Sequence, residues 1–595
     1  MKNFLISFLG ALAGIWFSLF LAVIGIFIVI AAAMASSGGN TTVNVSNNSV
    51  LCVDLSGTIY DRAPKIDIRE AIRGGGLEKN AQVLADITGA VTAAASDDRI
   101  EGIVMNCSGV SAGIAQLTAI IEALKDFKKN APEKWIYAYA DAYAQGDYYV
   151  ASVADSVFIN PVGMVEISGL SLSSLYYKRL LDKLGVDMQV VKVGTYKSAV
   201  EPYLLDRMSD PAREQAQLFL KNIWNDICTT IADARGVTVA DVNKWADDFV
   251  FTKDASTYKD LKIVDGLLYR HEFDRKIANL TGCDKIKDIK TITTAQYAKV
   301  ADTGKVGSGK GANIAVLYAT GEITDNSGNG IVASELVPEI LELAEDNDID
   351  GLIMYVNSPG GSAFASEQIW EALEQYKKLT GNPFYVSMAD YAASGGYYIS
   401  CGADRIFAQP VTLTGSIGIF GMIPDISGLV NDKIGIGVST VTTNANSNFP
   451  TIFEPMTEAQ KASMQTYVNR GYELFTSRCA EGRGMSQDSI KAIGEGRVWD
   501  GTEALKLGLV DELGGLDTAL AAMARQLNVE SYTVHSYPVA KDKWYDLLLE
   551  AGIEDIKAAI MRQELGEMCS LYDAIRQVKG MSVLQCRMEF TKVNL

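Results

Sequence analysis

A serine among small residues is the first side chain of this sequence that could do chemistry. Ser394 lies in the stretch ADYAASGGYY (389–398), which follows the apolar run FYVSMA and precedes a helical pattern. A serine at the carboxyl end of a strand is exposed to a substrate, and the Gly395 amide could donate to negative charge developing on a substrate carbonyl. Small residues at a helix start also serve close packing, so this stretch alone is a weak indication of catalysis.

An earlier copy of the same stretch strengthens the case. Residues 140–149 read ADAYAQGDYY and match six of the ten positions, but Gln145 stands in place of Ser394 and Asp147 in place of Gly396. A chain with one serine-bearing copy and one serine-free copy is expected if one half kept a nucleophile that the other lost.

A glycine-rich turn is the second chemical feature. The apolar strand LIMYV is followed by NSPGGS (357–362) and then by a helical pattern. Glycines at such a turn let backbone N–H groups approach a ligand and point at it, which suits an oxyanion. The other interpretation is a simple tight turn. The first half has SGVSAG (108–113) at this position, without the proline and the double glycine.

A serine nucleophile needs a base, and histidine is a poor candidate here. The chain has only His271 and His535, and neither lies near these motifs. The first half contains Lys197 in VGTYKSAVEPY, whereas the second half has NANSNFP in that region. To act near neutral pH, the pKa of Lys197 must fall by about 3 units, which burial can supply. The alternative is an ordinary solvated surface lysine.

The elements that carry these residues are duplicated along the chain. The two copies are separated by 249 residues, a spacing that also relates ALKDFKK (123–129) to ALEQYKK (372–378). Short apolar runs alternate with amphipathic patterns, which favours an α/β fold with parallel sheets. We expect one domain over 50–301, a Gly- and Lys-rich linker over 302–312 and a second domain over 313–595.

The N-terminus predicts a membrane anchor. Residues 4–35 contain no charged side chain, and about 20 apolar residues span a bilayer as a helix. A cleaved signal peptide is the alternative, since AAAMAS offers a cleavage site. We expect an anchor over 1–35, a polar tether over 36–49, and an N-terminus in the cytoplasm because Lys2 is the only charged side chain before the apolar run.

Composition excludes some functions. A net charge of −19 and a pI near 4.7 argue against a nucleic-acid surface. The eight cysteines lie far apart, with no CxxC pair or Cys/His cluster, so no metal site is expected. The tail from about Lys541 is amphipathic, and its pattern alone assigns no role.

Taken together, the motifs resemble those of the signal peptide peptidase family in its long, tandem form. YKSAVEP in the first half and SPGGS, ASGGYY and TGSIGI in the second carry this resemblance, which covers essentially the whole chain. It implies tandem domains of the ClpP/crotonase-like fold and a Ser-Lys protease without metal or cofactor. It further implies that Ser394 is the nucleophile, Lys197 the general base and Ser416 the residue that orients the lysine, with an oxyanion hole from amides of Gly360, Gly361 and Gly395.

The resemblance also implies a cellular location, an oligomeric state and a class of substrate. Such proteins are homotetramers of the bacterial inner membrane, with their catalytic domains on the periplasmic side, and they degrade cleaved signal peptides and other hydrophobic peptides through an acyl-enzyme. Two alternative functions remain. One is a crotonase-type acyl-CoA hydratase or thioesterase, whose fold also has a glycine-rich oxyanion loop. The other is an inactive membrane-tethered scaffold.

Overall fold

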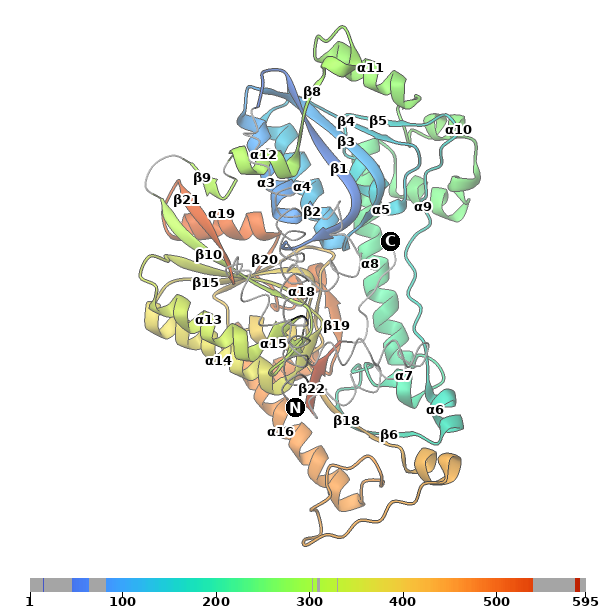
Figure 1. Cartoon of the computed structure of the whole chain (residues 1–595), viewed down its shortest axis with the longest axis vertical. Helices are drawn as coiled ribbons and strands as arrows, with labels where there is room; N and C mark the ends of the chain where they lie inside the picture. The colour runs from blue at the N-terminus through green and yellow to red at the C-terminus, as the bar shows by residue number, and fades with distance from the viewer. Residues whose placement is uncertain are drawn as a thin grey trace, which may run out of the picture. The chain divides into compact units, whose positions relative to one another are not determined.

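Strands of the first half form a parallel sheet, and Figure 1 shows β1, β3, β4 and β5 side by side. This computed structural model describes residue 14 and residues 45–63, 82–301, 303–307, 311–328, 330–538 and 584–588. The sheet has the order β2-β1-β3-β4-β5-β7, with β8 also pairing with β1. Its strands are β1 (Ser49–Tyr60), β2 (Gln82–Val83), β3 (Ile100–Ser111), β4 (Trp135–Ala140), β5 (Ser156–Ile159), β7 (Gly266–Leu267) and β8 (Lys290–Thr293).

The helices of this half begin and end at residues suited to those positions. In the long helix α8, Ser209 caps the N-terminus by accepting from the Ala212 amide, Pro211 lies in the first turn, and Gly236 ends the helix in a left-handed conformation. The helices are α3 (Leu84–Ser96), α4 (Ile114–Asn130), α5 (Gln145–Ala151), α6 (Lys178–Leu184), α7 (Glu201–Leu204), α8 (Asp210–Arg235), α9 (Val239–Asp247), α10 (Ala255–Asp260), α11 (Arg270–Leu280) and α12 (Thr294–Ala301).

The second half builds a larger sheet. Its order is β19-β17-β15-β13-β10-β21-β9, and β16 pairs with both β15 and β20. Neighbours from β17 to β21 are parallel, whereas β19 and β9 pair antiparallel with β17 and β21. The strands are β9 (Lys305–Val306), β10 (Ala312–Thr320), β13 (Gly351–Ser358), β15 (Phe384–Ala393), β16 (Arg405–Ala408), β17 (Leu413–Gly415), β19 (Val498–Asp500), β20 (Glu512–Leu513) and β21 (Tyr532–Tyr537). Strand β9 lies within the predicted linker.

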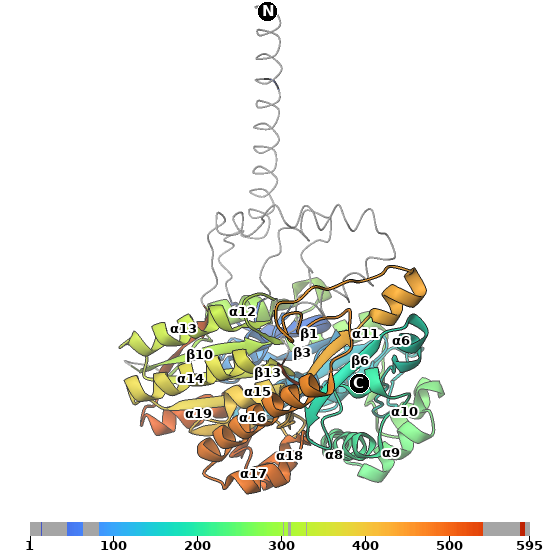
Figure 2. The ribbon, with the colours of Figure 1, turned by 90° about the horizontal axis from the view of Figure 1, so that it is seen from below.

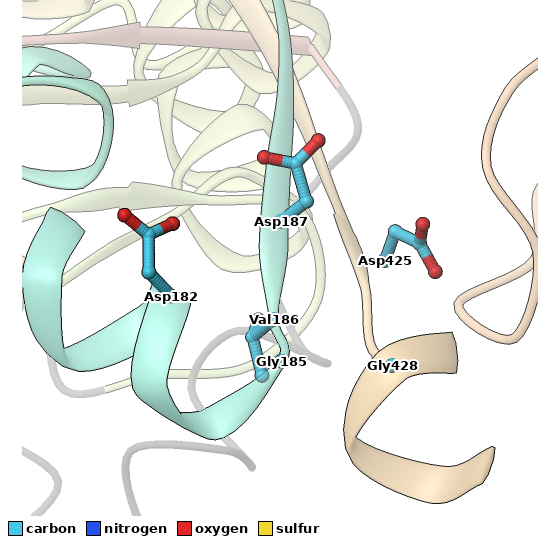
Figure 3. Close-up of a pocket in the computed structure, with 6 residues that line it drawn as sticks. All are labelled: Asp182, Gly185, Val186, Asp187, Asp425 and Gly428. Carbon is cyan, nitrogen blue, oxygen red and sulfur yellow. The ribbon is translucent and has the colours of Figure 1, made fainter. Parts of the chain in front are cut away.

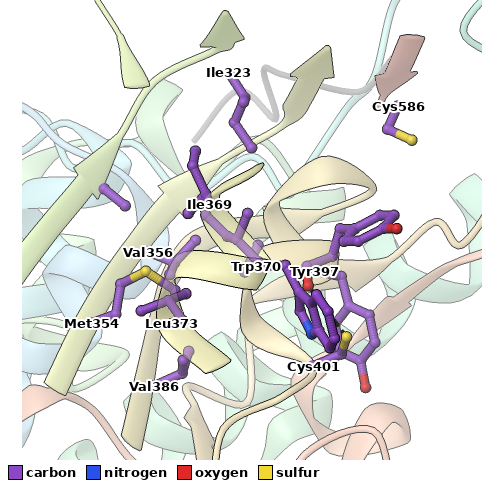
Figure 4. Close-up of a cluster of buried hydrophobic side chains, with 14 of the residues drawn as sticks. Ile323, Met354, Val356, Ile369, Trp370, Leu373, Val386, Tyr397, Cys401 and Cys586 are labelled. Carbon is purple, nitrogen blue, oxygen red and sulfur yellow. Dashed lines mark hydrogen bonds between the residues drawn. The ribbon is translucent and has the colours of Figure 1, made fainter. Parts of the chain in front are cut away.

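Helices cover both faces of this sheet, with α19 on one side of β10 and α13 and α14 on the other (Figure 1). Figure 2 shows α13 and α14 from below. Alternate residues of β10 point to opposite sides. Ala315, Leu317 and Ala319 join the cluster with α13 and α14, and part of this cluster is drawn in Figure 4; Ile314 and Val316 pack with α19. The helices are α13 (Ala333–Glu345), α14 (Ala363–Thr380), α15 (Gly395–Ser400), α16 (Glu458–Arg483), α17 (Gln487–Ile493), α18 (Gly501–Lys506) and α19 (Leu516–Gln526).

The two sheets repeat one topology. The parallel order β1-β3-β4-β5-β7 of the first half corresponds to β10-β13-β15-β16-β20 of the second. Strands β5 and β16 are offset by the 249 residues that relate the sequence copies. The expected tandem α/β organisation with parallel sheets is therefore confirmed.

A third sheet joins the halves. It has the order β12 (Ile331–Val332), β11 (Ile323–Thr324), β14 (Gly360–Ser362), β22 (Leu584–Arg587), β18 (Ile419–Asp425) and β6 (Asp187–Val193). Strand β6 of the first half pairs antiparallel with β18 of the second, from Val193 opposite Ile419 to Asp187 opposite Asp425. The described residues from 46 onward thus form one compact unit.

Apart from residue 14, the predicted anchor falls on residues that the structure does not describe. Among the helices it does describe, none combines the length and apolar character needed to cross a membrane.

Candidate active site

Ser394 lies at the carboxyl end of β15, at the first turn of α15. Its backbone has φ 57° and ψ −113°, an uncommon conformation for a residue with a side chain. Its amide donates to the Gly415 carbonyl at 2.8 Å, and its carbonyl accepts from the Tyr398 amide at 2.9 Å. These bonds turn the chain sharply from strand to helix and hold the hydroxyl at the carboxyl ends of the strands.

Lys197 reaches this serine from the other half of the chain. Its Nζ lies 2.6 Å from Ser394 Oγ, 3.0 Å from the Ser416 carbonyl oxygen and 3.1 Å from Ser416 Oγ. The lysine is only 1% exposed and Ser394 is fully buried. The structure therefore brings together the three predicted side chains Ser394, Lys197 and Ser416.

Burial changes the acidity of the lysine. It lowers the pKa of Lys197 from 10.5 to about 7, and proximity to Cys586 opposes this shift. Burial raises the pKa of the Cys586 thiol to about 12, so that thiol is neutral near pH 7. A neutral amine keeps two N–H groups and one lone pair. The two N–H groups can donate to Ser416 while the lone pair accepts from the Ser394 hydroxyl.

Ser416 follows β17, the strand next to the one that ends just before Ser394. Strand β17 pairs parallel with β15, with Gly415 opposite Ala393, so the residues that follow the two strands are neighbours. The Ser416 amide donates to the Arg497 carbonyl at 2.6 Å. Two oxygens of one residue thus contact the lysine amine.

A loop of the second half holds the lysine in position, and the sequence motifs missed it. The Tyr196 amide donates to the Glu495 carbonyl at 2.9 Å, and the Glu495 carboxylate accepts from the Thr195 amide at 3.0 Å. Gly496 packs so closely that a β-carbon on it would lie 2.7 Å from Lys197 Cβ. The segment GEGR (494–497) carries no chemical signature that would have indicated this contact.

Gln215 is a second positioning residue outside the predicted set. From α8, its amide nitrogen donates to the Tyr196 carbonyl and to Ser198 Oγ, both at 3.2 Å, and its oxygen accepts from the Val498 amide at 3.1 Å. Gln215 therefore links Tyr196 and Ser198, the residues on either side of Lys197, to strand β19.

The three predicted glycines meet beside the serine. A β-carbon on Gly395 would lie 3.1 Å from the Gly361 nitrogen, and one on Gly360, whose φ is +97°, would lie 2.7 Å from the Gly395 nitrogen. The Gly360 amide itself donates to Ser358 Oγ at 3.2 Å. The amides of Gly361 and Gly395 are therefore the better pair of oxyanion donors, while Gly360 permits the close approach.

The first half has a different arrangement at the same place. Gln145 accepts from the amides of Ser168 and Gly169 and donates to the Gly169 carbonyl. The carboxylate of Asp147 accepts from the amides of Gly109 and Val110, both at 2.9 Å. Amides of the loop that parallels NSPGGS are thus already bonded to a carboxylate, and a glutamine replaces the hydroxyl.

A pocket lies beside strands β6 and β18 of the third sheet. The pocket in Figure 3 has a volume of about 300 Å³ and is lined by Asp182, Gly185, Val186, Asp187, Asp425 and Gly428. None of the predicted site residues lines it. No group of three or more potential metal-ligating side chains occurs in the described part of the chain.

A serine activated by a lysine, beside two backbone amides, is the arrangement of a hydrolase that proceeds through an acyl-enzyme. The model of peptidase family S49 matches residues 128–284 and 376–530, and the Clp protease model matches residues 313–411. The chain belongs to peptidase family S49 and is a serine peptidase with ClpP-like domains in tandem.

Known proteins that match this chain over most of their own length are also proteases by name. The chain is 33% identical to Protease 4 of Haemophilus influenzae, over 84% of this chain and 83% of that protein. It is 32% identical to Protease 4 of Salmonella typhi, over 88% and 84%. It is 27% identical to the chloroplastic serine protease SPPA of Arabidopsis thaliana, over 82% and 70%.

Proposed function

We propose that this protein is a membrane-anchored signal peptide peptidase, which cuts hydrophobic peptides left after preprotein processing. The observation that carries the catalytic part is the 2.6 Å approach of Lys197 Nζ to Ser394 Oγ in a buried site. We assign Ser394 as nucleophile, Lys197 as general base and Ser416 as the residue that orients the amine.

The reaction begins with the neutral amine. Lys197 Nζ takes the proton of the Ser394 hydroxyl as Oγ attacks the substrate carbonyl carbon. The amides of Gly361 and Gly395 donate to the oxyanion. The protonated lysine then gives its proton to the leaving amine, and an acyl-enzyme forms. Water activated by Lys197 hydrolyses the ester and restores the serine.

The preference for hydrophobic peptides is supported by the side chains around the site. Ile323 of β11, and Ile419 and Phe420 of β18, are at most 2% exposed. They lie in the sheet that contains β14, the strand of Gly360 and Gly361. An extended peptide that takes the place of β22 between β14 and β18 would bond through its backbone and bury alternate side chains.

The cellular setting is part of the proposal. The charge-free residues 4–35 support a single-pass anchor in a bacterial inner membrane, with the N-terminus cytoplasmic and the catalytic halves periplasmic. We further propose that the protein assembles as a homotetramer.

The test is hydrolysis of a synthetic signal peptide by the detergent-solubilised protein. Ser394→Ala and Lys197→Ala should each lower kcat by about 10³-fold or more, because the dyad acts as a unit. The buried Ser152→Ala, whose hydroxyl donates only to the Tyr149 carbonyl, should keep normal activity. Activity that survives loss of Ser394 or Lys197 would refute the dyad. Turnover of acyl-CoA instead of peptide would favour a crotonase-type enzyme.

A further inference from the structure

The side chain of Arg497 contacts two aromatic rings, one from each half of the chain. Its guanidinium carbon lies 4.6 Å from the centre of the Tyr196 ring and 4.5 Å from the centre of the Trp499 ring. A guanidinium over an aromatic ring is attracted by the negative face of the ring, and the attraction is stronger where water is excluded. Because Tyr196 directly precedes Lys197, this contact acts on the loop that carries the lysine.

Few other groups hold this guanidinium. Its Nη2 donates to the Glu214 carboxylate of α8 at 3.0 Å, but the Glu214 side chain is 59% exposed, and an ion pair of that kind contributes little. The buried Nε of Arg497 has no hydrogen-bond partner in the part of the chain that the structure describes. The side chain is only 19% exposed. The two rings are therefore the main contacts of a charge that is largely removed from water.

The ring of Trp499 is fixed within the second half. Its Nε1 donates to the Ile493 carbonyl at 3.0 Å. Trp499 lies on β19, which pairs with β17, the strand that leads to Ser416. Arg497 thus joins Tyr196 of the first half to a ring held beside the strand that precedes Ser416.

The main chain of Arg497 acts on the same region. Its carbonyl accepts from the Ser416 amide at 2.6 Å, and its amide donates to the Gly494 carbonyl at 2.8 Å. Lys197 Nζ in turn contacts both oxygens of Ser416. One residue therefore holds Ser416 through its main chain and the loop of Lys197 through its side chain.

We propose that Arg497 is a positioning residue for the base: its guanidinium holds Tyr196, and through it Lys197, against Ser416 and away from water. This inference rests on the proposed function, in which Lys197 is the general base. Without the guanidinium, the lysine loop is free to move away from β19, and water reaches the amine. Hydration favours the charged form of an amine, so Lys197 would stay protonated to a higher pH.

The experiment measures hydrolysis of the synthetic signal peptide from pH 5 to 10 by the full chain in detergent. Arg497→Met keeps an apolar stem without the planar charge, and it should lower kcat at pH 7 by about 100-fold, with KM nearly unchanged. The limb of kcat/KM near pH 7 should move upward by about one pH unit or more. Arg497→Lys keeps the charge but not the planar group, and it should restore only part of the rate. If Arg497→Met does not fold, the limb of Arg497→Lys must still lie above that of wild type.

Arg405 supplies the matched control. Its guanidinium carbon lies 5.9 Å from the centre of the Tyr385 ring and 5.0 Å from that of Phe407, and its side chain pairs with Glu512. Tyr385 lies at the start of β15, the end opposite to Ser394. Arg405→Met removes the same kind of contact away from the dyad, so kcat and the pH limb should stay as in wild type.

The outcomes separate this inference from the proposed function. A limb that stays near pH 7 in Arg497→Met, or an equal loss of kcat in Arg405→Met, would overturn the inference and leave the proposed function standing. Glu214→Gln removes only the exposed ion pair and should lower kcat less than about threefold. A loss as large as that of Arg497→Met would assign the effect to the ion pair and also overturn the inference. A wild-type enzyme that is inactive on the peptide, or whose limb lies near pH 10, would refute the role of Lys197 itself.

Discussion

At the scale of single residues, the buried amine of Lys197 determines what the site can do. Burial disfavours its positive charge and favours the neutral form, so its pKa falls to about 7. That value is well matched to a general base working near neutral pH.

The first prediction concerns the pH dependence of the rate. The base must be deprotonated to accept the serine proton, so kcat/KM should rise through a limb near pH 7 and level off above it. Initial rates of peptide hydrolysis from pH 5 to 10 measure this limb. A limb near pH 10 would show that the lysine is not held in the neutral form.

The second prediction concerns stability. Between pH 7 and 10.5 the unfolded chain binds the Lys197 proton more tightly than the folded one, so stability rises with pH, by up to about 5 kcal/mol. Lys197→Met should remove this penalty and raise the free energy of unfolding at pH 7 by about 1–3 kcal/mol, although three hydrogen bonds are lost. Denaturant unfolding of the wild-type protein and of Lys197→Met at pH 7 and 10 measures this difference in the free energy of unfolding.

Lys134 supplies the matched control. It is also buried, and its Nζ donates to the carbonyls of Ala94 and Asp97, both at 2.8 Å. Lys134→Met leaves these acceptors without their donor and should destabilise the protein. If Lys197→Met were destabilising to the same degree, the lysine would be an ordinary structural residue.

The third prediction addresses Ser416. Its hydroxyl provides one of the two oxygens that contact Lys197 Nζ, and the main-chain oxygen would remain after Ser416→Ala. The loss of about one hydrogen bond, roughly 1.4 kcal/mol, corresponds to a tenfold fall in kcat. Peptide hydrolysis at pH 8 should show this fall, with KM nearly unchanged. An unaltered kcat would remove Ser416 from the positioning of the base.

At the scale of elements, the lysine loop and the loop 494–497 are packed against each other. The backbone of Gly496, at φ +77°, leaves no room for a side chain next to Lys197. A residue far from the motifs in sequence therefore determines where the amine lies.

The fourth prediction follows from this contact. Gly496→Ala should displace Lys197 and lower kcat by about 100-fold, since small displacements of catalytic groups have effects of this size. Gly435→Ala is the matched control, because Gly435 has φ +81° and open space around it. It should cost about 1 kcal/mol of stability with unchanged kcat. Equal losses of activity in the two variants would mean that backbone strain, not crowding of the lysine, is responsible.

At the scale of the whole molecule, the halves also meet at a half-buried carboxylate. Asp390 of β15 accepts from the Ala115 amide at the start of α4 in the first half at 2.8 Å. Asp61 lies nearby and accepts from Asn357, Tyr355 and Gln116. Burial, and then the charge of Asp61, raise the pKa of Asp390 to about 7.

The fifth prediction is a pH dependence of this junction. Between pH 3.8 and about 7 the folded protein binds the Asp390 proton more tightly than the unfolded chain, so stability falls as pH rises through this range. Asp390→Asn keeps an acceptor for Ala115 and should raise stability at pH 8 by about 1–3 kcal/mol, with little change at pH 4. Thermal unfolding at both values tests it. A variant destabilised at pH 8 would show that the charged form is required.

Much of this organisation was accessible from local patterns. Alternating apolar runs and helical stretches predicted parallel α/β units, and near-copies 249 residues apart predicted the tandem repeat, because burial on a sheet imposes a period on nearby residues. The same comparison singled out Ser394 and Lys197, since the serine and the lysine each occur in only one copy. The shared third sheet was not predictable, because β6 and β18 pair across more than two hundred residues and carry no local signal of each other.

Residue types and their spacing thus predicted the repeat and the fold class, and they selected Ser394 and Lys197 as the candidate dyad. The folded chain alone decided that the lysine is dehydrated and that Gly496 and Gln215 hold it in place. The physical reason is that the pKa and the position of an amine depend on which groups surround it and exclude water. Those groups come from segments that meet only when the two halves pack together.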